Sequence, residues 1–178
     1  MTRVRYARGQ GMKDTIEIVL DDGSNRVALW RNTFVQIRRG AQTTQSIDLL
    51  MGSWRAFKLR IEGDLFALFV VEAGAHMVGS DVRKRQREVI KEVLSHNRLH
   101  RAVVLEGEGI LADLKRVAAR GLADSRTKVF RDVLEAAESL ARTPGAPSVA
   151  EMLSVVSAAR DPTRQPLPDE LPISRRFW

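Results

Sequence analysis

Two uninterrupted apolar segments constrain the fold of this chain more than any other feature. Residues 65–71 read Leu-Phe-Ala-Leu-Phe-Val-Val, and residues 102–105 read Ala-Val-Val-Leu. Apolar runs of this length are typical of strands that are covered on both faces, as in a parallel sheet flanked by helices. Glycine-containing loops follow both segments, at 74–79 and at 106–109. We therefore predict that the two segments are adjacent buried strands of one sheet.

Amphipathic stretches alternate with these segments, with the apolar spacing that a helix requires. Their candidate starts, in chain order, are Thr43 or Thr44, Ser80, the glycine turn at 106–109, Asp132 and Ser148. Ser, Thr and Asp are preferred N-caps. Glu135 and Glu151 stand three residues after the candidate caps Asp132 and Ser148, as in a capping box. Strands that alternate with helices call for mostly parallel pairing through right-handed crossovers.

The beginning of the chain has a different pattern. Residues 15–20 alternate apolar and polar side chains, a turn sequence follows at 21–24, and two short extended segments follow at 27–30 and 33–38. This pattern predicts an N-terminal β-hairpin that joins the sheet. A further short strand is expected at 128–131.

Together these elements predict a single α/β domain at residues 15–142, with a mostly parallel or mixed central sheet covered by about four helices. Residues 1–14, which carry Arg3, Arg5, Arg8 and Lys13, are expected to form a flexible basic leader. Residues 143–178 are expected to form a C-terminal helix and an extended tail rich in proline that ends at Trp178.

The composition excludes several classes of site. The chain has no cysteine, which rules out disulfides, thiolate metal sites and cysteine nucleophiles. No run of about 18 apolar residues is present, and no apolar block follows the early arginines, so neither a membrane span nor a secretory signal is expected. A cytoplasmic protein is the resulting expectation. The formal net charge of +7 indicates attraction to anionic partners.

Two motifs resemble sites of chemistry. Residues 107–112 match the spacing of a dinucleotide fingerprint, but Glu106 and Glu108 would oppose a pyrophosphate, so a tight glycine turn is the favoured interpretation. His96 and His100 stand four apart, as zinc ligands on a helix do, but the glutamate of the zincin motif is absent. We therefore expect no catalytic residue, no cofactor and no metal, and a protein that is not an enzyme.

The order of strands and helices from about 27 to 142 resembles the STAS-like domain of bacterial anti-sigma-factor antagonists. The segments that carry the resemblance are strands 33–38, 65–71, 102–105 and 128–131, with Val-Val-Glu-Ala-Gly at 70–74 and Glu-Gly-Glu-Gly at 106–109. The resemblance implies a regulatory domain in which a phosphorylatable serine caps the helix after the central strand. Ser80 holds that position. Asp81 follows it where the family has other residues, and an acid there disfavours phosphorylation, which leaves a plain N-cap as the alternative.

These expectations favour a non-catalytic regulatory module that binds another protein through the loop and helix around residues 74–87. The residues expected on that surface are Ser80, His76, Arg83, Lys84 and Arg87. One alternative is a domain that binds a small ligand, a lipid or an anion between sheet and helices. Another is weak electrostatic binding of nucleic acid by the leader and the basic helix. A homodimer formed through an open edge of the early strands stays possible, and the sequence does not choose between monomer and dimer.

Overall fold

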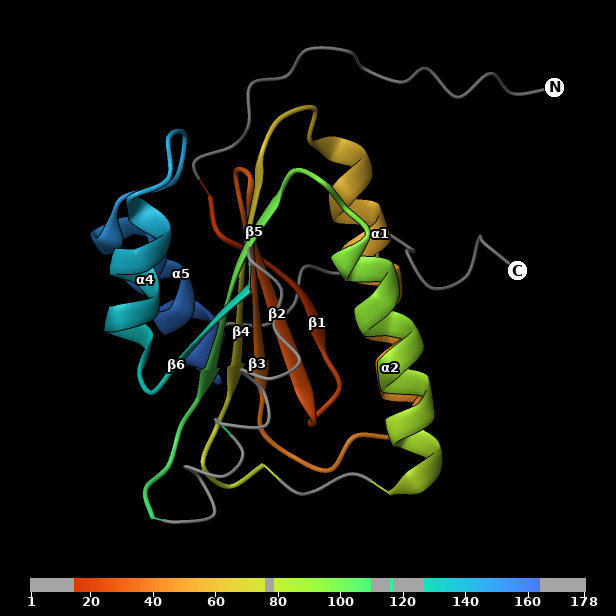
Figure 1. Ribbon diagram of the computed structural model, residues 1–178. Helices are drawn as coiled ribbons and strands as arrows, with labels where there is room; N and C mark the ends of the chain where they lie inside the picture. Colours follow the sequence, from red (N-terminus) through yellow and green to blue (C-terminus); the bar gives the residue numbers. More distant parts are fainter. Residues whose placement is uncertain (1–14, 76–78, 110–115, 117–126, 164–178) are drawn as a thin grey trace, which may run out of the picture.

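The computed structural model describes residues 15–75, 79–109, 116 and 127–163. These residues form six strands and four helices around one sheet (Figure 1). In chain order the elements are β1 (Glu17–Asp21), β2 (Asn25–Trp30), β3 (Thr33–Arg38), α1 (Thr44–Arg60), β4 (Leu65–Val71), α2 (Ser80–Leu94), β5 (Leu99–Leu105), β6 (Thr127–Phe130), α4 (Val133–Ala141) and α5 (Val149–Arg160). The predicted α/β class with a mixed central sheet is confirmed. The leader, the proline-rich tail and the helix expected after the 106–109 turn lie outside the described residues, apart from Arg116.

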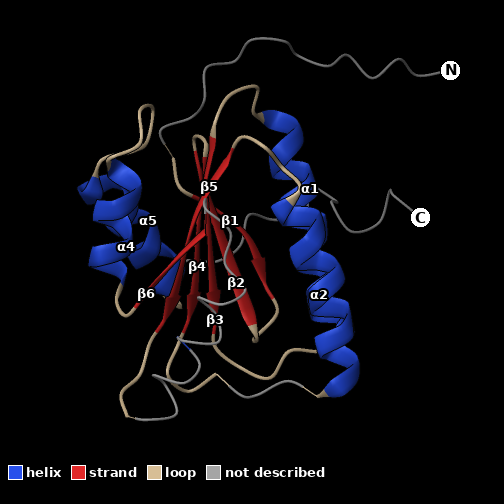
Figure 2. Ribbon diagram, in the orientation of Figure 1, coloured by secondary structure: helices blue, strands red, loops and turns tan. Residues whose placement is uncertain are grey.

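The strands lie side by side in the order in which they occur in the chain (Figure 2). Strands β1, β2 and β3 pair antiparallel and form the expected N-terminal hairpin unit. Strands β3, β4, β5 and β6 pair parallel, with Val35, Leu68 and Ala102 in one row across the centre. The two apolar segments are therefore neighbouring central strands, as their composition predicts.

Alternate side chains of the strands enter two separate cores, because neighbouring residues of a strand point to opposite faces. On one face Val35 and Leu68 pack with α4 and α5, including Met152. On the other face Phe34 packs with Trp54 of α1, their ring centroids 5.5 Å apart and their planes nearly perpendicular. Figure 1 shows the two pairs of helices on opposite faces of the sheet.

Local side-chain hydrogen bonds fix the starts of three helices as predicted. The side chains of Thr43, Asp132 and Ser148 accept hydrogen bonds from the backbone N–H three residues later. The prediction that Ser80 caps α2 is wrong. Gly79 is the N-cap, because its carbonyl already accepts the hydrogen bond from Arg83 N, and Ser80 is the first helical residue.

Helix α5 belongs to the same core as the predicted domain. Met152, Val155 and Val156 are buried against the sheet, so the packed core extends beyond residue 142. Arg39, which follows β3, donates hydrogen bonds to the carbonyls of Ala159 and Arg160 at the end of α5. This contact satisfies carbonyls that the end of a helix leaves without partners. Within the described part of the chain, no helix is both long enough and apolar enough to cross a bilayer.

Candidate functional site

Helix α2 is attached to α1 by two ion pairs. Arg85 contacts Asp48, with an Nη2–Oδ1 distance of 2.6 Å, and Arg55 contacts Glu92, with an Nη2–Oε2 distance of 2.7 Å. The hydrogen bonds from Arg55 hold the pKa of Glu92 below its usual value. The pairs fix the rotation of α2 about its axis, and they determine which of its residues face solvent.

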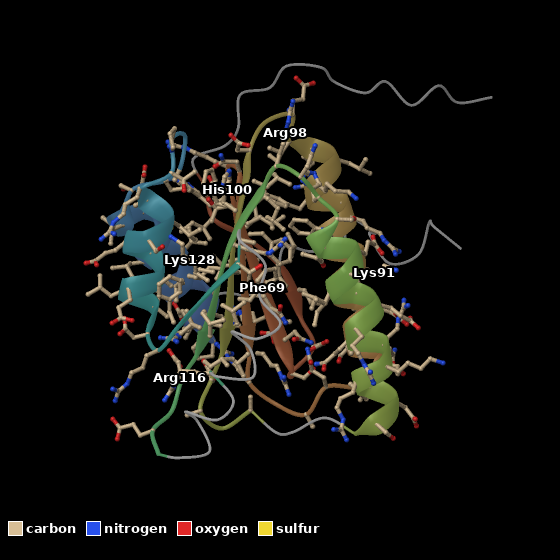
Figure 3. The ribbon with its side chains drawn as sticks, viewed as in Figure 1. Phe69, Lys91, Arg98, His100, Arg116 and Lys128 are labelled. Atoms are coloured by element: carbon tan, nitrogen blue, oxygen red, sulfur yellow. The ribbon has the colours of Figure 1, made fainter. Side chains whose placement is uncertain are left out.

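The outer face of α2 carries cations that have no acidic partner in the described part of the chain. Arg83, Lys84, Arg87 and Lys91 are exposed, and no ion pair joins them to a described carboxylate. The first three were predicted on this surface. Lys91 was missed, although residues 83, 87 and 91 follow the four-residue step of one helix face. Figure 3 labels Lys91 on α2, on the side of the molecule away from α4 and α5.

The two polar residues predicted beside these cations have different outcomes. Ser80 is exposed, and its hydroxyl lies 3.4 Å from Asp81 Oδ1. His76 lies outside the described residues. The structure therefore places Ser80 on the same helix as Arg83, Lys84 and Arg87, as its first residue.

A cavity of about 340 Å³ lies between the sheet and helices α1 and α2. Its floor is formed by β3 to β6, and most of its lining is apolar. The described residues that line it are Phe34, Gln36, Arg38, Gln42, Ile47, Leu50, Met51, Trp54, Phe69, Val70, Val71, Gln86, Val89, Ile90, Val93, Arg101, Val103, Thr127 and Val129. The sequence did not single out this set, because its members come from six elements and from the loop before α1.

The sheet register arranges the floor of the cavity in rows. Gln36, Phe69, Val103 and Val129 form the middle row, each paired with its neighbour on the next strand. Figure 3 labels Phe69 on β4, within this row. Arg101 and Thr127 pair in the row on one side, and the Nε of Arg101 donates a hydrogen bond to the Thr127 hydroxyl. The middle of the floor is thus apolar over three strands.

Two arginines and an indole bring polar donors to the cavity. Arg101 is buried, whereas Arg38 at the end of β3 is half-buried. Burial lowers the pKa of the Arg38 guanidinium. The indole N–H of Trp54 has no hydrogen-bond partner among the described residues, although the side chain is only 1% exposed. Most buried donors in proteins have a partner, so this one is an exception that calls for an explanation.

A chain of buried amides connects the edge of the cavity to β2. Gln36 and Gln42 each donate a hydrogen bond to Asn25 Oδ1, at 2.7 and 2.8 Å. Gln86 of α2 in turn donates to Gln42 Oε1. These bonds tie the loop before α1 and the first half of α2 to the sheet.

The histidines do not share a helix face, contrary to what their spacing suggested. Helix α2 ends at Leu94, and His100 lies in β5, whose start at Leu99 precedes the predicted one by three residues. His96 lies against Trp54, with ring centroids 6.3 Å apart, and burial lowers its pKa. His100 stacks on Phe66 on the opposite face of the sheet from Trp54. No cluster of three metal-ligating side chains occurs among the residues that the structure describes.

The glycine turn after β5 is held by side chains. Gly107 and Gly109 adopt positive φ angles of 111° and 90°, which glycine tolerates without strain. Arg116, labelled in Figure 3, donates hydrogen bonds to the carbonyls of Leu105 and Gly107. Glu106 binds Arg160 of α5. Asp132, the acid that would contact a ribose in a dinucleotide site, serves as the N-cap of α4, and Ala112 lies outside the described residues.

Comparison of the chain with protein-family models, with curated proteins and with solved structures found no match.

Proposed function

We propose that this chain is a non-catalytic regulatory module of STAS-like type, which binds an acidic partner protein through the surface around residues 74–87. The observation that carries the proposal is the set of exposed cations on α2 that form no ion pair with any described carboxylate. Arg83, Lys84 and Arg87 face solvent, while Glu88 and Glu92 of the same helix are engaged by Arg85 and Arg55. The helix therefore presents these three cations to solvent, while the two carboxylates are held in ion pairs with Arg85 of α2 and Arg55 of α1.

The apolar neighbour of these cations favours a protein over a nucleic acid. The side chain of Ile90 is 51% exposed, three residues after Arg87 and therefore next to it on the helix surface. Protein interfaces combine an apolar centre with a charged rim, whereas single-stranded nucleic acids are bound by aromatic stacking beside cations. None of the residues of α2 is aromatic. The expected partner surface is acidic, with an apolar contact for Ile90.

The chemistry of the surface supports binding and not bond making. Within 74–87, the described hydroxyl and carboxylate side chains are Ser80 and Asp81, which are exposed neighbours. A hydroxyl needs a general base held in a defined position to become a nucleophile. The surface instead offers exposed cations on a helix that two ion pairs attach to α1, which suits recognition.

The experiment that tests the proposal is affinity capture from an extract of the source cells, with nuclease added. The wild-type chain is compared with Arg83→Glu/Arg87→Glu and with Lys128→Glu/Arg142→Glu, which makes the same change of net charge on exposed residues outside α2. A protein retained by the wild type and by the second variant, but lost from the first, and bound again as a purified protein, supports the proposal. Equal retention by the wild type and both variants, or retention that disappears with nuclease, contradicts it.

A further inference from the structure

The cavity between the sheet and helices α1 and α2 is a second feature, separate from the outer cations of α2. Its volume of about 340 Å³ lies at the lower end of the range for small-molecule sites, which is about 300–1,000 Å³. Such sites are mostly apolar, with a few polar groups that orient the ligand. The cavity has this composition.

The apolar part of the cavity is a continuous surface. Phe69, Val103 and Val129 lie in one row across β4, β5 and β6, and Met51 and Trp54 of α1 form part of the wall. Neighbouring strands are about 4.8 Å apart, so the row spans about 10 Å. An elongated apolar body of that length fits along it.

The charged side chains of the lining favour a ligand with negative charge. No carboxylate is among the described residues that line the cavity, whereas Arg38 and Arg101 both line it. Arg101 donates to Thr127 within the floor. Arg38 is the more accessible of the two, and a guanidinium has five N–H donors, so it is able to bind an anion in addition to its other contacts.

The wall of the cavity also contains the buried indole of Trp54. Its N–H is a buried donor without a hydrogen-bond acceptor among the described residues, and its side chain lines the same cavity. Arg38 lies four residues beyond Phe34, the ring that Trp54 contacts, so an anionic group at Arg38 does not supply this acceptor, and Trp54 contributes apolar contact to the wall.

We propose that the cavity binds a small amphipathic anion, with its apolar body along the Phe69–Val103–Val129 row and its anionic group at Arg38. The ligand class is a medium-chain carboxylate or a molecule of the same shape and charge. Arg38 supplies charge-assisted hydrogen bonds, and the apolar row supplies contact area. The proposal does not depend on Arg83, Lys84 and Arg87, the cations of the proposed partner surface, because none of them lines the cavity, although Ile90 belongs to both.

Isothermal titration calorimetry of the full chain with decanoate and with decanol tests the proposal. The two probes share the alkyl chain and differ in charge. We expect decanoate to bind more tightly than decanol by about tenfold or more, because a hydrogen bond to a charged group is worth that much. Arg38→Gln is expected to abolish this difference. Arg83→Gln/Arg87→Gln is the control and is expected to leave decanoate binding unchanged, since these residues are not on the cavity lining.

A second variant separates the cavity from nonspecific association. Val103→Trp fills the middle of the floor and is expected to prevent binding of both probes. Circular dichroism shows whether this variant folds, and Val103→Met replaces it if it does not. Absence of decanoate binding to the wild type overturns the proposal. So does decanoate binding that survives Arg38→Gln with its preference over decanol intact, or binding that is unaffected by the variant that fills the cavity.

Discussion

Arg85 of α2 donates two hydrogen bonds to the carboxylate of Asp48 on α1, from Nε at 2.8 Å and from Nη2 at 2.6 Å. Glu88 accepts a third bond from the same guanidinium at 2.8 Å. Arg85 is therefore turned toward α1, while Lys84 and Arg87 are exposed to solvent. The proposed partner surface depends on this division, because a rotation of α2 would exchange the inner and outer cations.

Replacement of Asp48 tests how firmly α2 is held. Asp48→Asn removes the charge that Arg85 contacts, and the pair is more than a third exposed on both sides. We expect a loss of about 0.2–1 kcal/mol in the free energy of unfolding. Relative to the wild type, amide hydrogen exchange in the variant should accelerate more within α2 than within α1. Urea titration and exchange measured by mass spectrometry check both. Glu62→Gln, at an exposed carboxylate between α1 and β4, is the control and should change neither.

The second ion pair between α1 and α2 predicts a dependence of stability on pH. Hydrogen bonds from Arg55 lower the pKa of Glu92 in the folded chain. A carboxylate with a lowered pKa stabilises the fold fully above its unfolded pKa of about 4.3, and this contribution is lost as the pH falls through the lower folded value. Glu92→Gln should therefore reduce stability at about pH 6 and make no difference at about pH 2. An equal deficit at both values would contradict this origin of the effect.

The parts of the fold that the sequence predicted are those set by local physics. An uninterrupted apolar run such as 65–71 needs cover on both faces, wherever the rest of the chain goes. The caps at Asp132 and Ser148 require only a side chain and a backbone N–H three residues later. The same reasoning failed at Ser80, because two adjacent positions satisfied the pattern and the helix used the backbone of Gly79.

The candidate sites depend on residues that are distant in the sequence. His96 and His100 have helical spacing, but pairing with β4 draws Leu99 and His100 into β5. The cavity combines Trp54 of α1 with Val103 of β5 and Arg38 of β3, and only the strand register brings them together. In contrast, the cations at 83, 84 and 87 were predictable, since exposure follows from the helix period alone.

The capping box of α5 gives a prediction about stability. The Ser148 hydroxyl accepts a hydrogen bond from Glu151 N, and the Glu151 carboxylate accepts one from Ser148 N at 2.8 Å. Ser148→Ala should lower the free energy of unfolding by about 1 kcal/mol, because Glu151 N loses its side-chain acceptor. Chemical denaturation measures the loss. Ser154→Ala, at an exposed position within the same helix, is the control, and a loss as large there would show that the cap is not the cause.

The buried amide chain gives the largest expected loss of stability. Asn25 is 1% exposed, and its Oδ1 is the acceptor for both Gln36 and Gln42. Asn25→Ala would leave two buried amide donors without that acceptor. A buried donor without a partner costs about 1–3 kcal/mol, so we expect a loss of at least about 2 kcal/mol in the free energy of unfolding.

Two further variants separate the hydrogen bonds of Asn25 from its volume. Asn25→Leu keeps the branched shape and the number of side-chain heavy atoms, with larger methyl groups, but still removes the acceptor, so it should be at least as destabilising as Asn25→Ala. Adding Gln36→Leu and Gln42→Leu to Asn25→Leu removes the donors as well and should recover part of the loss, since apolar groups have no hydrogen bonds to satisfy. Urea denaturation of the four proteins measures these differences. Full stability in Asn25→Leu alone would mean that water or other groups satisfy Gln36 and Gln42, and that the chain from α2 through Gln42 to the sheet does not stabilise the fold.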